Sequence, residues 1–163
     1  MNCKSNNQCG NEHNTGAESR NCTKELLEEL EKDVHMATLA LNNIMPKVKN
    51  SDLSAEFVKE LGKYSEYSDQ ISKMIRDAGG EPKDANVFSK ITSKVGIEMN
   101  TLTDPTDEHI AQMAIEGTTM GITDIIRQLR DFENSNCSEE ALSLAREIVS
   151  YQEKTVEKLK SFL

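Results

Sequence analysis

Three cysteines and a histidine lie close together at the start of the sequence and could bind a metal ion. Cys3, Cys9, His13 and Cys22 follow the spacing C-x5-C-x3-H-x8-C. Thiolates and imidazoles are the ligands that tetrahedral zinc takes in proteins. The spacing matches no established zinc module. Two other interpretations therefore stay open: a flexible tail whose thiols are reduced, as in the cytoplasm, and a tail that forms disulfide cross-links.

A second group of candidate metal ligands lies within segments that we predict to be helical. Glu31 and His35 share a polar stripe on one segment, and Asp124 lies near the interior side of another. A di-iron carboxylate site in a helical bundle uses Glu-x-x-His on two helices. The sequence contains no Glu-x-x-His. We therefore predict no classical di-iron site, and an altered site that uses Glu31, His35 or Asp124 stays open.

The sequence also lacks the motifs of nucleophilic and phosphate chemistry. It has no phosphate-binding glycine loop, no nucleophile elbow, and no Cys–His pair within the segments predicted as helices. This favours a protein without catalytic activity or cofactor.

Composition excludes several classes of partner. The 163 residues carry a formal net charge of −9, with a pI near 4.9. Such acidity disfavours nucleic acid and anionic membranes. The absence of Trp and an aromatic content of 4 % argue against a stacking platform for bases. No apolar run is long enough for a membrane span, and the polar start predicts no secretion signal, which makes the cytoplasm the default.

Apolar residues at alternating steps of three and four predict four long helices, at 23–49, 52–79, 105–134 and 139–162. Pro46 should bend the first helix near its end, and Gly79–Gly80 should stop the second. Asp104 is the expected N-cap of the third, and Ser138 of the fourth. In the first helix the inward positions are Leu27, Leu30, Val34, Ala37, Leu41, Ile44 and Val48.

The connector between the second and third helices determines the topology. Residues 81–103 contain a shorter predicted helix, 85–100, and could span about 45 Å. This is enough to return the chain along a helix of about 40 Å. Two antiparallel hairpins joined by such a crossover form a ferritin-like four-helix bundle, which is the predicted all-α fold. The predicted domains are a disordered Cys- and Asn-rich tail at 1–22 and the bundle at 23–163.

Two predictions concern the middle of the bundle. Gly117 and Gly121 lie on the apolar line of the helix at 105–134, where we expect them to allow close packing. Tyr64, Ser68 and Gln152 come at the same height on inward faces and should form a buried polar cluster. We expect the hydroxyl of Tyr64 or Ser68 to bond to Gln152, because an unpaired buried amide costs about 1–3 kcal/mol.

The stretch HIAQMAIEGTTMGITDI, the Asp104 turn before it and the final VEKLKSFL resemble a group of ferritin-like proteins from clostridia and their relatives. The resemblance covers about 23–163. It rests on packing motifs, so it implies the fold and carries no activity, ligand or site residue.

Three functions are consistent with these features. The first is a non-catalytic helical bundle that associates with itself or with a protein partner, because the helix at 105–134 has a wide apolar arc. The second is a metal-handling ferritin-like protein with an altered site. The third is a structural component of a spore or envelope layer, cross-linked through the cysteines of the tail, which would place the protein at the spore rather than in the cytoplasm.

Overall fold

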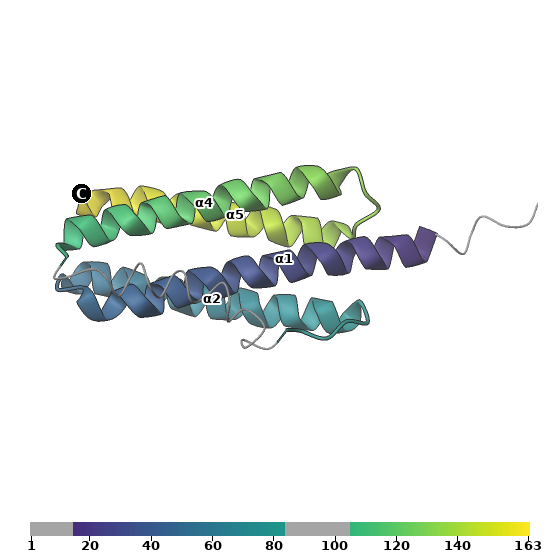
Figure 1. Cartoon of the computed structure of the whole chain (residues 1–163), viewed down its shortest axis with the longest axis horizontal. Helices are drawn as coiled ribbons and strands as arrows, with labels where there is room; N and C mark the ends of the chain where they lie inside the picture. The colour runs from purple at the N-terminus through teal and green to yellow at the C-terminus, as the bar shows by residue number, and fades with distance from the viewer. Residues whose placement is uncertain (1–14, 84–104) are drawn as a thin grey trace, which may run out of the picture.

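Four long helices make up the described part of the protein. The computed structural model describes residues 15–83 and 105–163, with side chains from residue 21 onward. The helices are α1 (Thr15–Ile44), α2 (Ser51–Asp77), α4 (Asp107–Glu133) and α5 (Glu139–Leu159). Short 3-10 turns, η1 (Met45–Lys47) and η3 (Lys160–Phe162), follow α1 and α5. All four predicted long helices are confirmed, and the two described ranges contain no strand (Figure 1).

Local sequence explains where the helices begin and end. The α-helical part of α1 stops at Ile44, two residues before Pro46, as the missing N–H of proline requires. The Asn50 side chain caps α2 by accepting from the first free amides of that helix. Gly79, with φ of +80°, ends α2 in a conformation that favours glycine. Ser138 caps α5 as predicted.

Two predicted helix starts are wrong. α1 begins at Thr15 rather than Thr23, so part of the segment predicted as a disordered tail is helical. α4 is capped by Thr106, whose hydroxyl accepts from the His109 amide at 3.2 Å, and not by Asp104. The predicted crossover helix at 85–100 and the first 14 residues lie outside the described residues.

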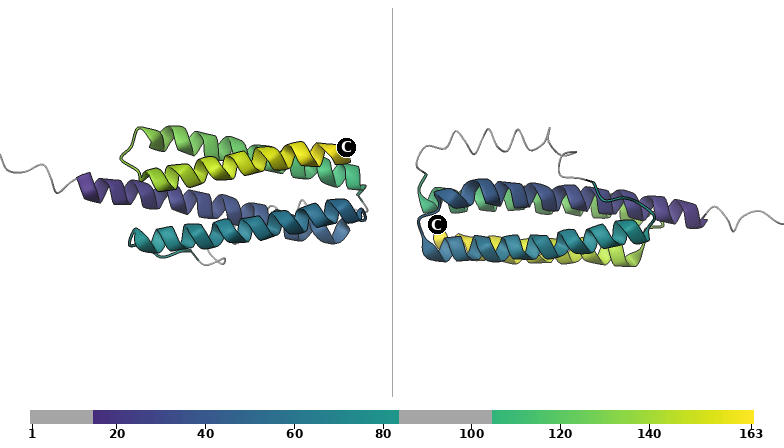
Figure 2. Two further views of the ribbon diagram at one scale, coloured as in Figure 1. Left: turned by 180° about the vertical axis from the view of Figure 1, so that it is seen from behind. Right: turned by 90° about the horizontal axis from the view of Figure 1, so that it is seen from below.

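Contacts at both ends of the bundle fix the directions of the helices. Lys49, just after α1, donates its amide to Asp107 at the start of α4, at 2.8 Å. At the other end, Ser138 donates its amide to the Thr23 hydroxyl at 2.9 Å. α1 is therefore antiparallel to both α2 and α4, and α2 and α4 run in the same direction (Figures 1 and 2). The chain must travel the length of the bundle between α2 and α4.

The core follows the predicted seam of α1 closely. In α1, five of the seven predicted positions are buried, and Ala37 and Val48 are partly buried. Leu163, which continues the apolar spacing of α5, is 59 % exposed. In α2 the buried line is Leu53, Phe57, Glu60, Tyr64, Tyr67, Ile71 and Ile75. Ser68, predicted to face inward, is only half-buried, and so is the apolar residue Leu61.

The two glycines of α4 have different surroundings. A Cβ built on Gly117 would meet nothing within 4 Å, so the predicted close packing is wrong there. A Cβ on Gly121 would lie 3.4 Å from Nε2 of Gln152. Gly121 therefore makes room for an amide from α5 and not for the Tyr64 ring. None of the described helices is both long and apolar enough to cross a membrane.

Candidate functional site: a buried polar layer between α2 and α5

A layer of polar side chains lies where α2 crosses α5. Glu60, Tyr64 and Tyr67 come from α2, and Tyr151 and Gln152 come from α5. We call these five residues the polar layer. Tyr64 and Tyr67 are 1 % exposed and Gln152 is 3 % exposed, so most of the layer is cut off from solvent. Steps of three and four along α2 put its members on one face, which is why they all reach α5.

Tyr64 and Gln152 form the hydrogen bond predicted from the sequence. Nε2 of Gln152 donates to the Tyr64 hydroxyl at 3.4 Å, a long bond between two buried groups. The bond joins α2 to α5 and confirms this half of the predicted cluster. Ser68, the third predicted member, is half-buried, and Tyr67 occupies the inward position beside it.

The three tyrosines pack edge to face. The Tyr151 ring contacts Tyr64 with centroids 6.2 Å apart and Tyr67 with centroids 5.9 Å apart. Such pairs add about 0.5–1.5 kcal/mol beyond the area that they bury. At the edge of the layer, Tyr67 donates to Glu147 at 3.2 Å, and the Lys63 ammonium lies 4.6 Å from the centre of the Tyr67 ring.

Glu60 is the most unusual member of the layer. It is 1 % exposed, and its Oε1 has no hydrogen-bond partner among the described residues. Burial raises the pKa of Glu60 to about 8, and the nearby carboxylate of Glu56 raises it further than Lys59 lowers it. Glu60 is therefore a neutral acid at pH 7. It can donate or accept a proton near pH 8, where ordinary glutamates are fully ionised.

Two more oxygens of the layer are buried with no hydrogen-bond partner in the described part of the chain. These are Oε1 of Gln152 and the hydroxyl of Tyr151. Burial raises the pKa of Tyr151 to about 12, and the nearby Thr155 side chain lowers it only in part, without reaching hydrogen-bond geometry. Burial likewise raises the pKa of Tyr64 and Tyr67, so all three phenols stay protonated at neutral pH. The layer offers oxygen donors and acceptors but no activated nucleophile.

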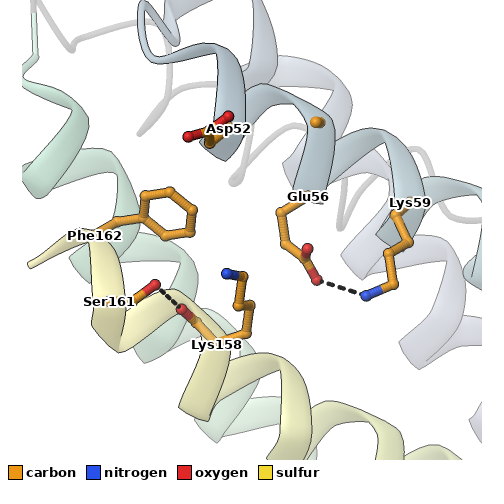
Figure 3. Close-up of a pocket in the computed structure, with 7 residues that line it drawn as sticks. Asp52, Glu56, Lys59, Lys158, Ser161 and Phe162 are labelled. Atoms are coloured by element: carbon orange, nitrogen blue, oxygen red, sulfur yellow. Dashed lines mark hydrogen bonds and ion pairs between the residues drawn. The ribbon is translucent and has the colours of Figure 1, made fainter.

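A hollow lies between the start of α2 and the end of α5 (Figure 3). It holds about 550 Å³ and is open to solvent. The Lys158 ammonium lies 5.5 Å from the centre of the Phe162 ring, and Glu56 pairs with Lys59 at 3.1 Å. Two acids and two lysines line it, which gives no preference for a ligand of either sign. Its lining residues are Asp52, Ala55, Glu56, Lys59, Lys158, Ser161 and Phe162.

The candidate ligands Glu31, His35 and Asp124 are not brought together around a common point. Glu31 faces the end of α2, where it is 7 % exposed and accepts from the Lys83 amide at 3.1 Å. Burial raises its pKa, and that hydrogen bond opposes the rise. Asp124 pairs with Arg127 at 2.8 Å on α4. Among the described residues, no three His, Cys, Asp or Glu side chains form a group that could hold a metal ion.

A second raised acid lies between α1 and α4. Asp33 of α1 accepts from Nε2 of Gln128 at 2.8 Å. Burial raises the pKa of Asp33 to about 6, the bond from Gln128 lowers it, and the charge of Asp124 adds to the rise. This hydrogen bond joins α1 to α4.

The candidate zinc ligands of the tail are divided. Cys22 lies in α1, is 9 % exposed, and forms a disulfide with Cys137 across a sequence separation of 115 residues. Its sulfur is thereby unavailable to zinc while the bond is intact. Cys3, Cys9 and His13 lie outside the described residues.

Several members of these sites were not predicted, although the sequence holds a signal for some of them. Glu60 lies on the inward line four residues before Tyr64, but a charged residue is assigned to the surface by default. Tyr151 directly precedes the inward-facing Gln152 on α5, and this position explains why Tyr151 is half-buried. The signal for Glu60 and Tyr67 is the regular spacing of Phe57, Glu60, Tyr64 and Tyr67 itself.

Comparison with known proteins assigns no function to this site. No protein-family model matches the sequence, and a search of curated proteins finds no significant match. The function must therefore be argued from the residues.

Proposed function

We propose that this protein is a non-catalytic bundle of ferritin-like topology that associates with a second copy of itself through α4. The observation that carries the proposal is Met120, which is 68 % exposed at the centre of the helix. Ile126, on the same helix, is 36 % exposed. At 100° per residue Ile126 lies about 120° round the helix from Met120, so Met120 is the apolar side chain on which the proposed contact is centred.

The outer face of α4 is also poor in free hydrogen-bonding groups near its centre. The Thr119 hydroxyl donates to the Ile115 carbonyl at 2.7 Å, and the Thr123 hydroxyl donates to the Thr119 carbonyl at 2.9 Å. Each threonine therefore presents a methyl group outward with its polar atom already bonded. We call Glu116, Thr119, Met120, Thr123 and Arg127 the α4 strip; helical spacing puts them on one face.

Charge along the α4 strip selects the partner and its orientation. Glu116 and Arg127 lie at equal distances on either side of the midpoint between Gly121 and Ile122. Two copies packed antiparallel about that midpoint put Glu116 opposite Arg127 of the partner subunit, twice over. A two-fold interface of this kind is self-complementary. Arg127 is 66 % exposed in its present pair with Asp124, and so exposed a pair is weak enough to exchange.

Charge reversal tests this proposal. The mass in solution, measured by light scattering over a range of concentrations, should be that of a dimer for the native chain. Glu116→Arg and Arg127→Glu should each favour the monomer, because each puts like charges opposite one another. The double variant should recover the dimer, because its charges are again complementary.

Two results would end the proposal. One is a native chain that stays monomeric at the highest concentrations tested. The other is a double variant no better than either single one. Glu153→Arg, a charge reversal at an exposed site on α5, is the matched control and should leave the mass unchanged.

Metal handling by an altered site is a second candidate, favoured by the unpartnered oxygens of Glu60 and Gln152. We place it second because the three histidines of the sequence contribute nothing to the polar layer. Elemental analysis of the untagged protein, followed by anaerobic loading with Fe(II), separates it from the first. We expect no stoichiometric iron; two irons per chain with oxidation in air would establish it.

A structural role in a spore or envelope layer is the third candidate, and the disulfide favours it. Disulfides persist mainly in oxidising compartments. The bond between Cys22 and Cys137 therefore supports that setting over the cytoplasm, while leaving Cys3 and Cys9 for cross-links between chains. Non-reducing gels of native extracts should then show covalent dimers or larger species, which a cytoplasmic protein with reduced thiols would not form.

A further inference from the structure

The disulfide joins the start of the bundle to the hairpin between α4 and α5. Cys22 lies near the beginning of α1, and Cys137 lies between the end of α4 and the N-cap of α5, with the two Cα atoms 5.2 Å apart. Beside it, the Ser138 amide donates to the Thr23 hydroxyl at 2.9 Å. One covalent bond and one hydrogen bond thus link the same two dipeptides, 22–23 and 137–138.

The turns of α1 before this junction project past the other helices. Figures 1 and 2 show the first part of α1 extending beyond the loop between α4 and α5. A helix of so few turns is marginal in water without tertiary contacts. The fully buried residues Leu26, Leu27 and Leu30 lie on the other side of the junction. The Cys22–Cys137 bond therefore lies at the base of the projecting part of α1.

The two cysteine residues differ in exposure. Cys22 is 9 % exposed within the helix, whereas Cys137 is half-buried in the loop, next to the exposed residues Ser135 and Asn136. A thiol from solvent therefore reaches Cys137 first. After reduction, the fully buried Leu26 and Leu27 still hold the adjoining part of α1 in the bundle. The thiols stay within reach of each other, which makes the bond easy to re-form.

We propose that the Cys22–Cys137 bond is a reversible redox clamp, opened by a dithiol, that holds the projecting start of α1 on the junction of α4 and α5. One thiolate of the dithiol attacks Sγ of Cys137 and forms a mixed disulfide, and the Cys22 thiolate leaves and takes up a proton. The second thiolate of the reductant then attacks the reductant's other sulfur atom, which is bonded to Cys137 in the mixed disulfide. It closes a cyclic disulfide and releases Cys137, which is also protonated.

In sum, two electrons and two protons pass from the dithiol to the cysteine pair. A disulfide oxidant reverses the step. Opening frees only the start of α1, because the buried leucines beyond the junction still hold the rest of the helix in the bundle.

Hydrogen exchange measured by mass spectrometry tests the clamp. The full chain carries Cys3→Ser and Cys9→Ser, so that no other thiol can exchange. In the oxidised protein, digestion without reductant should yield a cross-linked peptide containing Cys22 and Cys137. Dithiothreitol should then speed amide exchange about tenfold or more in residues 15–25 and 134–141, with residues 64–75 of α2 unchanged. Reoxidation with oxidised glutathione should restore the slow exchange.

Adding Cys22→Ser and Cys137→Ser provides the matched control. This variant should exchange like the reduced protein in both segments and should not respond to dithiothreitol. Free thiols at both positions in the oxidised protein would overturn the proposal. So would identical exchange in the two redox states, or a loss of protection that spreads through α2. None of these results depends on whether the protein is a dimer.

Discussion

Replacing Glu60 with glutamine should stabilise the protein, and the gain should grow with pH. The pKa of Glu60 is raised from 4.5 to about 8 in the folded state, first by burial and then by Glu56. The folded state therefore holds this proton more tightly than the unfolded state does. The stability that it contributes is fully present below about pH 4.5, falls as pH rises, and is gone above about pH 8.

The size of the effect follows from the shift. Each pKa unit corresponds to 1.36 kcal/mol; at pH 7 Glu60 is ionised in the unfolded chain but neutral in the folded one, and this lowers the stability by about 3 kcal/mol relative to its value at low pH. Glutamine keeps the shape of the side chain but carries no charge at any pH. The difference in unfolding free energy between Glu60→Gln and the native chain should grow by about 3–4 kcal/mol from pH 5 to pH 8.5.

Urea unfolding at several pH values measures this difference, because all other ionisable groups are common to both chains. With a denaturant slope of about 2 kcal/mol/M, the midpoints should separate by a further 1.5–2 M, roughly, across this range. Glu66→Gln is the control: the Glu66 side chain is 70 % exposed on the same helix and pairs with Lys63. A difference that is constant with pH would show that Glu60 does not ionise in a buried site.

Five further single substitutions test other contacts. Gln152→Ala and Tyr64→Phe should each destabilise the protein by about 1–3 kcal/mol, and the double variant should lose less than the sum of the two. Additive losses in urea unfolding would mean that the 3.4 Å hydrogen bond between these residues contributes nothing. Gly117→Ala should stabilise by about 1 kcal/mol, because its Cβ would meet nothing. Gly121→Ala should gain less, since its Cβ would lie 3.4 Å from Gln152, and equal gains in melting temperature would contradict this reading. Ser138→Ala should cost about 1 kcal/mol by removing the cap of α5, whereas an unchanged melting temperature would show that the cap is dispensable.

The helices could be predicted from sequence because their signals are local. Pro46, Gly79 and Ser138 each act within a turn or two of chain, through a missing amide, a positive φ and a capping hydroxyl. The same holds for the seam of α1, where apolar spacing alone identifies the buried face. The start of α1 is the exception, because an Asn-rich composition is typical of a tail and gives no helical periodicity.

The contents of the polar layer could be predicted only in part. Tyr64 and Gln152 follow from their heights along the helices. Glu60 does not, because the spacing along α2 allows either Glu60 or Leu61 as the inward residue, and hydrophobicity favours the wrong one. The bond between Cys22 and Cys137 is beyond local reasoning altogether, because a separation of 115 residues leaves no signal in either neighbourhood.

The polar layer also bears on how the two hairpins find their register. An apolar contact between α2 and α5 would tolerate a slip of one turn, because one aliphatic side chain packs about as well as the next. A slip would separate Gln152 from Tyr64 and leave both buried groups unpaired, at a cost of about 1–3 kcal/mol each. Glu60 acts in the opposite direction, since its burial weakens the same contact as pH rises. The register of α2 on α5 should therefore be best defined at acidic pH, where the Tyr64–Gln152 bond is present and Glu60 costs least.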